Sequence, residues 1–319
     1  MNFDQIHSFL NTPILSLTKN SSGRRLAVLT LDNIISFFSL NEFKKYEFEG
    51  PSSQLITSHK GSQIKFAPSE YGSILALSDL DGGIHLYEEI KSKNAIKKNW
   101  SVLKEFIFPE EKILDFKFSP MFQGFQFAVA SSFGILRVYQ NQNNLEFNHW
   151  ELICEETVTV NRKGIKSISW CKNPFFSPMI AVLCEYEFSE HERNVSRAEI
   201  FLYVNNGDNW KMLDKLPSQY NYYRYAEDIT WSNNLGKTYE SIVCCGEDGV
   251  YIWNFWLEDG KIKIKDMENV MLDGEEGSMK KVNWNPNGQI ISCIDEKNTV
   301  FLCKEMSEKW RCVYKFEKK

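Results

Sequence analysis

The chain has 319 residues, of which 43% are hydrophobic and 14% aromatic, and it carries a formal net charge of −5. This apolar content is sufficient for a sizeable core, and the acidic balance argues against a basic face that binds nucleic acid non-specifically. No apolar run approaches the length of a membrane span, and the first ten residues lack the basic and apolar regions of a signal peptide.

The eight cysteines fit reduced thiols better than a disulfide framework. No two of them are spaced as CxxC, and most fall within predicted strands. Cys244 and Cys245 are adjacent, so their side chains point to opposite faces of one strand. Without a signal peptide, buried thiols in a cytosolic or nuclear protein are expected.

The chain begins with an extended segment and a first group of four short strands. Residues 1–10 contain the apolar points Phe3, Ile6 and Phe9, which could form an extra N-terminal strand. Strands are predicted at 14–17, 26–30, 34–40 and 45–48, with the turn SSG at 21–23.

The second group of strands contains a motif similar to a WD repeat. The tripeptide HKG at 59–61 precedes strands at 64–66, 74–77 and 84–87. In such repeats the loop histidine can hydrogen-bond to an aspartate in the turn between the second and third strands. The partner of His59 would be Asp79 or Asp81. The terminal Trp-Asp dipeptide itself is absent.

The third and fourth groups span residues 113–157 and 165–216. The fourth has the longest insertion, residues 185–197, which is rich in Glu, Arg, His and Asn. This composition cannot bury itself and predicts a solvated loop on one face.

The last group, residues 279–316, shows the plan most clearly. A short strand ends on Trp284, the turn NPNG at 285–288 follows, and strands at 290–294 and 299–303 flank a polar turn. Trp310 opens a fourth strand. Four short strands joined by turn residues are typical of one blade of a β-propeller.

Three markers repeat in register along the chain. An aromatic residue closes the first strand at intervals of about 49 to 61 residues, a Trp opens the fourth strand, and a turn, most often with glycine, joins the second and third. The first marker occurs as Phe66, Phe118, Trp170, Trp231 and Trp284, with Leu17 in the equivalent place at the start. The sequence therefore predicts an all-β fold, a single β-propeller domain of the WD-repeat type. Its six four-stranded blades fall at about 11–50, 51–108, 109–161, 162–218, 219–272 and 273–319.

No constellation of residues indicates catalysis, a cofactor or a metal. The five histidines, His7, His59, His85, His149 and His191, show no spacing typical of a metal site. Acidic clusters fall in loops whose mutual geometry the sequence does not fix, so solvated faces explain them. We therefore expect a protein that is not an enzyme.

An aromatic run between the fourth and fifth blades is a second kind of candidate. Tyr and Arg are residues that interfaces prefer at their energetic centres. The run is a possible surface interface or simply covers a blade edge, and it contains Tyr220, Tyr222, Tyr223 and Arg224.

Several segments resemble one family, the Seh-type nucleoporins, which are homologues of the Sec-thirteen coat protein. The resemblance covers essentially the whole chain in the same blade order. It is clearest in DFKFSP at 115–120, GILRVY at 134–139, FSPMIAV at 176–182, AEIFLY at 198–203, NLGKTY at 234–239 and DGVYIW at 248–253. The segment SPMIAV separates this family from the coat protein itself.

The resemblance implies a scaffold subunit of the Y-shaped complex of the nuclear pore, at the nuclear envelope. Members form an open propeller of six blades, and a partner nucleoporin donates a seventh. Other subunits of the Y-shaped complex are further expected partners. A second role in a vacuole- or lysosome-associated nutrient-signalling complex is also implied. We expect no cofactor, no direct contact with nucleic acid, no membrane insertion and no homo-oligomer.

An open propeller would expose unpaired strand edges, which invite pairing with another chain. We expect the partner-binding edges at Ile14, Leu15, Ser16 and Leu17 in the first blade and at Lys281, Val282, Asn283 and Trp284 in the sixth. Two other hypotheses stay open: a subunit of a vesicle coat like the Sec-thirteen protein, or a free-standing WD-repeat adaptor that binds a peptide on one face.

Overall fold

The structure is a computed structural model that describes residues 12–91, 98–143, 146–158, 164–190, 193–207, 209–217, 225–258, 260–270, 272 and 277–317. For residues 91, 98, 186–190 and 193–197 it describes the backbone alone. The predicted N-terminal strand with Phe3, Ile6 and Phe9, and the aromatic run with Tyr220, Tyr222, Tyr223 and Arg224, lie outside the described residues. No helix in the described part is long and apolar enough to cross a membrane.

The fold is all-β. The described residues form six antiparallel sheets, each with four strands in chain order, as the blades of a β-propeller have. We call them blades one to six. Three short 3-10 helices lie in the connections: η1 (Pro51–Ser53), η2 (Ser69–Tyr71) and η3 (Met121–Gln123).

The chain divides into two compact units. The first comprises the chain up to Ile113, together with Gly124–Gln126 and Gln140–Glu151. It contains blade one, with β1 (Ile14–Lys19), β2 (Arg25–Thr30), β3 (Ile34–Leu40) and β4 (Tyr46–Phe48), and blade two, with β6 (Gly61–Phe66), β7 (Ile74–Asp79), β8 (Gly83–Lys91) and β9 (Lys98–Ile107). The short strand β5 (Leu55–Ile56) pairs with β3. It therefore belongs to the first sheet, although the repeat had placed residues 51–56 in the second blade.

The second unit comprises Leu114–Gln123, Phe127–Tyr139 and Leu152–Lys319. Blade three consists of β10 (Ile113–Phe118), β11 (Gln126–Ser131), β12 (Ile135–Asn141) and β13 (Trp150–Thr157). Blade four has β14 (Ile165–Trp170), β15 (Met179–Glu190), β16 (Arg193–Asn205) and β17 (Trp210–Lys215). Blade five has β18 (Ala226–Trp231), β19 (Glu240–Gly246), β20 (Gly249–Glu258) and β21 (Lys261–Asn269). Blade six has β22 (Met279–Trp284), β23 (Ile290–Asp295), β24 (Val300–Met306) and β25 (Lys309–Phe316).

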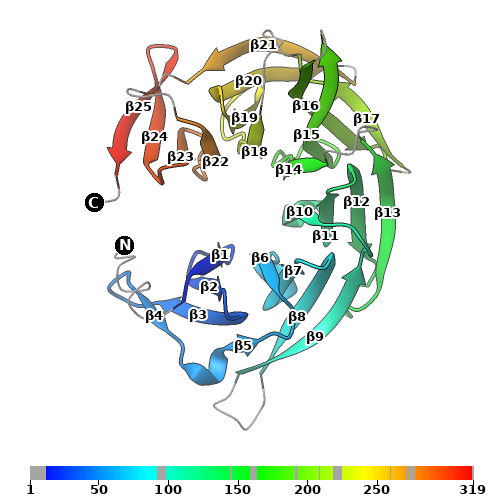
Figure 1. Cartoon of the computed structure of the whole chain (residues 1–319), viewed down its shortest axis with the longest axis vertical. Coiled ribbons are helices and arrows are strands. Elements are labelled where there is room, and N and C mark those ends of the chain that lie inside the picture. The colour runs from blue at the N-terminus through cyan, green and yellow to red at the C-terminus, as the bar shows by residue number, and fades with distance from the viewer. Residues whose placement is uncertain are drawn as a thin grey trace. The chain divides into compact units, whose positions relative to one another are not determined.

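Within each unit the first strands of consecutive blades lie next to one another, as β1 and β6 or β14, β18 and β22 do in Figure 1. The hydrophobic core lies between the blades. One cluster joins Leu29 and Phe37 of blade one to Ile64 of blade two. Similar clusters join blade three to four, four to five, and five to six. Most of the core is therefore buried between two blades, although Leu26, Val28 and Phe38 of blade one form a small cluster with side chains of their own blade.

The predicted aromatic marker closes the first strands β6, β10, β14, β18 and β22. The assignment of Leu17 to the same place in blade one is wrong. Leu17 pairs with Val28 and Lys19 with Leu26, just as Ile64 pairs with Leu77 and Phe66 with Leu75. Lys19 therefore occupies the aromatic position. In blades four and six, the indole of Trp170 or Trp284 donates a hydrogen bond to a carbonyl of the preceding blade. Among the described residues, no sheet before blade one supplies such a carbonyl next to Lys19.

The insertion at residues 185–197 is not the predicted loop. β15 and β16 continue their pairing from Glu185 and Ala198 as far as Glu190 and Arg193. The polar residues there alternate with Tyr186 and Phe188, and this period of two is typical of a strand. The prediction of a loop relied on the polar composition of the segment and did not take this alternation into account.

A buried ion-pair network reinforces the contact between blades one and two. The guanidinium of Arg25 lies 2.8 Å from Glu49 Oε1 and 2.7 Å from Glu89 Oε2. The same group lies over the rings of Phe37 and Trp100, which are stacked with centroids 4.7 Å apart. A bidentate, stacked arginine suits this place better than lysine would.

Trp284 provides a test of the register. Its side chain is 8% exposed, and its indole donates to the carbonyl of Thr230 at 3.1 Å. We expect Trp284→Ala to lower the free energy of unfolding by about 3–5 kcal/mol, as for other buried large aromatics. Urea denaturation measures this loss, with Trp284→Phe as the milder control that removes mainly the hydrogen bond. A loss below about 1 kcal/mol would contradict the packing between blades five and six.

Candidate functional site

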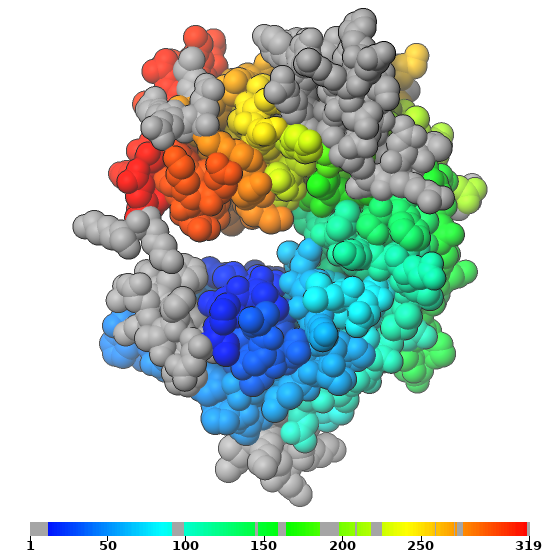
Figure 2. Space-filling model, in the orientation of Figure 1, coloured from blue at the N-terminus to red at the C-terminus, as the bar shows by residue number. Residues whose placement is uncertain are grey.

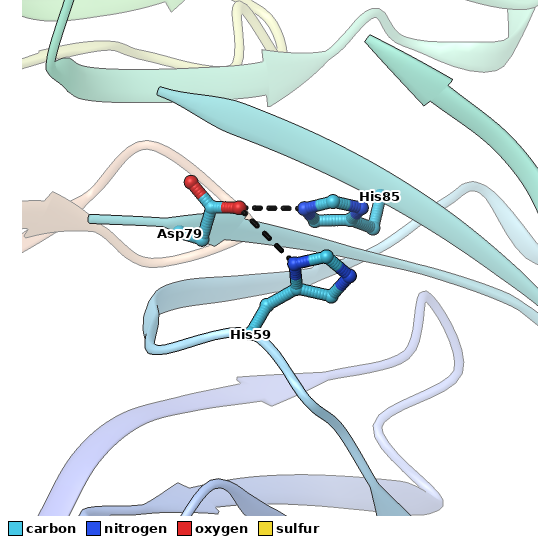
Figure 3. Close-up of side chains that lie close together, drawn as sticks. All are labelled: His59, Asp79 and His85. Carbon is cyan, nitrogen blue, oxygen red and sulfur yellow. Dashed lines mark hydrogen bonds and ion pairs between the residues drawn. The ribbon is translucent and has the colours of Figure 1, made fainter. Parts of the chain in front are cut away.

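Two histidines and an aspartate form a compact cluster in blade two (Figure 3). His85 Nε2 lies 2.6 Å from Asp79 Oδ2, and its Nδ1 lies 2.9 Å from Glu105 Oε1. The ring of His59 stacks on that of His85 with centroids 3.7 Å apart, and its Nδ1 is 3.6 Å from Asp79 Oδ2. His59 therefore lies beside Asp79, but 3.6 Å is too long for the predicted hydrogen bond, and the hydrogen bond to Asp79 is made by His85 instead.

The turn between β7 and β8 holds the aspartate in place. Asp79 Oδ1 accepts hydrogen bonds from the backbone N–H groups of Asp81 and Gly83. A Cβ atom at Gly83 would lie 2.4 Å from Asp79 Oδ2 and 2.6 Å from His85 Nε2. Glycine is needed at position 83 because any side chain would enter the cluster.

The cluster does not fit a metal ion. Ligand atoms around zinc each lie about 2.0–2.2 Å from the ion, which keeps them well over 3 Å apart in a tetrahedral site. Asp79 Oδ2 and His85 Nε2 are only 2.6 Å apart, so a proton and not a metal lies between them. We interpret the cluster as a structural clasp that ties the loop before β6 to the β7–β8 turn. Residues 59, 79 and 85 come together only through strand pairing, so sequence spacing could not reveal the cluster.

Hydrogen bonding determines the charge of this clasp. Burial alone would raise the pKa of the Asp79 carboxyl above its ordinary value of 3.8. Hydrogen bonds from His85 and from the N–H groups of Gly83 and Asp81 outweigh burial and hold the pKa below that value. The ionised carboxylate therefore stabilises the folded chain at neutral pH.

A second candidate site consists of exposed apolar side chains on blades one and six. The residue two places before the closing position of each first strand is buried in blades two to six. Its exposure is 0% at Ile64, Phe116, Ile168 and Ile229, and 1% at Val282. The equivalent residue of blade one, Leu17, is 45% exposed, and Leu15 is 42% exposed. Two exposed leucines on one strand form an apolar patch of the kind that is typical of an interaction surface.

The first strands are also linked by hydrogen bonds from side chains of one blade to the backbone of the next. Polar side chains on the earlier strand accept N–H groups of the following strand. The pairs are Ser16 with Ile64 at 3.1 Å, Thr18 with Phe66 at 3.4 Å, Asp115 with Ile168 at 3.1 Å, Ser169 with Trp231 at 2.9 Å and Asp228 with Val282 at 3.3 Å. We call this series the inter-blade ladder.

The ladder has unmatched groups at both ends. In blade one, the N–H groups of Leu17 and Lys19 are equivalent to those of Ile64 and Phe66. Within the described part of the chain, no side chain accepts them. In blade six, Asn283 is equivalent to Thr18 and Ser169, and its amide makes no hydrogen bond to another described residue. One blade therefore offers free donors, and another offers a free acceptor.

Blade six exposes an apolar face. In blades two, three and five, every residue of the second strand is buried, whereas in β23 buried residues alternate with half-buried ones. The half-buried Ile294 pairs with Val300, and Val300 pairs with Phe316, so all three side chains lie on one face. Tyr314 and Phe316 on the same face are 65% and 54% exposed and stack on each other. Orange and red atoms of this blade are visible at the surface in Figure 2.

The structure separates the predicted partner-binding residues into two groups. Leu15, Leu17, Lys281 and Asn283 are exposed. The other four have partners within the chain: Ser16 accepts the Ile64 N–H, Ile14 packs near Leu26 and Val28, and Val282 and Trp284 are buried against blade five. The sequence argument relied on strand edges, but the first strand of every sheet pairs on one side only. Exposed faces distinguish blades one and six, and the half-buried Ile294, Val300 and Leu302 were missed.

Comparison with known proteins shows which proteins the chain is similar to. No family model matches the chain. It is 24% identical to Protein SEH1 of Arabidopsis thaliana, over 89% of this chain and 89% of that protein. It is 22% identical to Nucleoporin SEH1-B of Xenopus laevis, over 91% of this chain and 81% of that protein. It is also 24% identical to Nucleoporin seh1 of Schizosaccharomyces pombe, over 93% of this chain and 81% of that protein.

The chain is a relative of the Seh-type nucleoporins. The crystal structure of Saccharomyces cerevisiae Sqt1 superposes with a TM-score of 0.66 at 14% identity, covering 96% of this chain and 75% of that one. This likeness supports the fold alone. Together with the six sheets, it confirms the predicted β-propeller, and the curated relatives confirm the resemblance to the Seh-type family.

The histidine clasp predicts a pH-dependent effect on stability. We expect Asp79→Asn to destabilise the fold at pH 7 by about 1–3 kcal/mol, because a charged acceptor in a buried hydrogen bond is lost. The folded pKa of Asp79 is depressed, so its contribution is present above about pH 4 and disappears as the pH falls through the folded pKa. Urea denaturation at pH 7 and near pH 3 measures the difference.

Asp81→Asn is the control for this experiment, since the Asp81 side chain is exposed and only its backbone N–H bonds to Asp79. We expect it to change stability by less than about 0.5 kcal/mol. If Asp79→Asn were as mild at pH 7, or if its effect did not shrink in acid, the structural role of the clasp would be contradicted.

Proposed function

We propose that this protein is a non-enzymatic scaffold subunit of the Y-shaped outer-ring complex of the nuclear pore. Its partner is a nucleoporin that supplies a seventh blade in trans. The observation that carries the proposal is the 45% exposure of Leu17, whose counterparts in the other five blades are at most 1% exposed. The names of the curated relatives support the nuclear-pore assignment.

The inter-blade ladder specifies what an inserted blade must provide. To continue the series after blade six, its first strand would present an N–H group to the amide oxygen of Asn283. To continue the series before blade one, its side chains would accept the N–H groups of Leu17 and Lys19. An apolar face on each side would cover Leu17 on one blade and Ile294, Val300 and Phe316 on the other. A four-stranded blade meets all of these requirements at once.

Such an interface would be large and mainly apolar. Contacts between consecutive blades bury nearly all of two sheet faces, as the cores between blades four, five and six show. We therefore expect the interface with the partner to exceed the standard size of roughly 1,600 Å². A chain that lacks its partner would expose both faces and tend to aggregate.

The proposed location is the nuclear pore at the nuclear envelope, with the other subunits of the Y-shaped complex as neighbours. We also propose that the same two faces serve a partner in a nutrient-signalling complex at the vacuole or lysosome. One insertion surface admits one donated blade at a time, so the two assemblies would compete for the chain. The six blades would act as a single propeller domain once the seventh is in place.

A charge on the exposed face of β1 tests the proposal. We expect Leu17→Glu to abolish co-purification of the partner nucleoporin, because burying an unpaired carboxylate against an apolar blade costs several kcal/mol. The matched control is Leu80→Glu, since Leu80 is 58% exposed in the β7–β8 turn and lies away from both faces. Affinity purification from the native cell, with mass spectrometry of bound proteins, measures the outcome.

Equal recovery of a nucleoporin by Leu17→Glu and Leu80→Glu would contradict blade insertion at this face. Recovery of no nucleoporin by the wild-type chain, together with a stable monomer in solution, would contradict the scaffold function itself and favour the free-standing adaptor.

A further inference from the structure

A hollow in the second unit has features that blade insertion does not use. Its volume is about 410 Å³, and its walls come from the first strands of blades three to six and the connections after them. Lys117, Trp170, Lys172 and Asn233 are among the lining residues. We call this hollow the lysine pocket. Its volume is within the range of about 300–1,000 Å³ typical of ligand sites.

The two lysines of the pocket differ in their partners. The ammonium of Lys117 donates to the carbonyl of Ile168 and lies 3.3 Å from Asp115 Oδ2, so its charge is compensated. Lys172 makes no ion pair within the described part of the chain. Burial and repulsion by Lys117 lower its pKa to about 8, so at neutral pH the group remains largely charged. A half-buried cation without a carboxylate is an unfavourable arrangement that an anion would relieve.

One exposed apolar side chain lines the pocket, and two more follow lining residues closely in the chain. Phe122 lines it and is 45% exposed, Phe175 is 92% exposed and follows Lys172 by three residues, and Leu235 is 64% exposed and follows Asn233 by two. All three belong to connections between the first and second strands of blades three, four and five. These connections do not form the apolar faces of blades one and six. Several large apolar side chains around a polar hollow are typical of a protein-binding surface.

We propose that the lysine pocket binds an acidic side chain of a short partner segment whose neighbouring apolar residues contact Phe122, Phe175 and Leu235. The carboxylate of this acidic side chain compensates the charge of Lys172. The rings of Trp170 and Phe122 cover the methylene groups of the acidic side chain. The apolar rim favours a peptide over a nucleic acid, because an oligonucleotide would need further cations around the pocket. The pocket shares Asn283 with the inter-blade ladder. The inference does not depend on blade insertion, since Lys172 and the three apolar side chains belong to other loops and make another kind of contact.

A selection experiment tests the proposal without knowledge of the natural partner. A phage-displayed library of random peptides is selected on the full chain, and the enriched peptides are synthesised. We expect aspartate or glutamate next to Phe, Leu or Trp in these peptides. Fluorescence polarisation with a selected peptide should then show a dissociation constant that rises about 10- to 100-fold when its acidic residue is replaced by the amide, as for loss of a charge-assisted hydrogen bond.

Two pairs of variants assign the binding to the pocket. We expect Lys172→Met to weaken binding to the same degree, whereas Lys211→Met, an exposed lysine on β17 of the same blade, has no effect. Phe175→Ser should weaken binding, whereas Phe43→Ser should not, although Phe43 is 82% exposed in blade one. Circular dichroism confirms that each variant is folded.

Three outcomes would overturn the proposal: enriched peptides without acidic residues, equal binding to Lys172→Met and the wild type, or no enrichment at all. If the wild type bound a single-stranded oligonucleotide tightly and Lys172→Met did not, the occupant of the pocket would be a nucleic acid and not a peptide. None of these outcomes would affect recovery of a blade-donating nucleoporin, so the two proposals can fail separately.

Discussion

The contact between consecutive first strands is the constraint on which the rest of this structure depends. In blades two, four, five and six, an apolar residue two places before the end of the first strand packs against the preceding blade. Polar side chains of several first strands bind the backbone of the following blade. A single β-sheet of four short strands cannot bury enough surface alone. Each blade therefore owes its stability to its neighbours, and a blade at either end of the series retains an uncovered face.

This constraint connects the fold to its function. Leu17 is exposed, and Ile294 and Phe316 lie on a half-open apolar face. Among the described residues, no side chain accepts the N–H groups of Leu17 and Lys19, and none bonds to the amide of Asn283. These features are the ones that the proposed insertion of a seventh blade would use. The histidine clasp and the Arg25 network act in the opposite direction, because they stabilise the first unit while Leu17 on its outer face is exposed. The proposed scaffold function rests on the match between these groups and those that a further blade would present.

Sequence reasoning reached the fold because turn residues and the closing aromatics repeat with a readable period. It placed Trp284 correctly, since a buried indole at a fixed strand position is visible in the sequence. It misplaced Leu17, because the bulge between Ile14 and Ser16 shifts the register and no aromatic marks the strand end. It missed the partnership of His85 with Asp79 and the open face with Ile294, because both depend on which residues pair across strands.

The most direct test of this account is hydrogen exchange at single amides of the first strands. In the free chain, the account predicts fast exchange for the N–H groups of Leu17 and Lys19 and slow exchange for the equivalent Ile64 and Phe66, whose N–H groups are bound by Ser16 and Thr18. Addition of the blade-donating partner should slow amide exchange at Leu17 and Lys19 to the rates of Ile64 and Phe66. Slow exchange at Leu17 and Lys19 in the monomeric chain would show that this strand already has its neighbour, and would contradict the account.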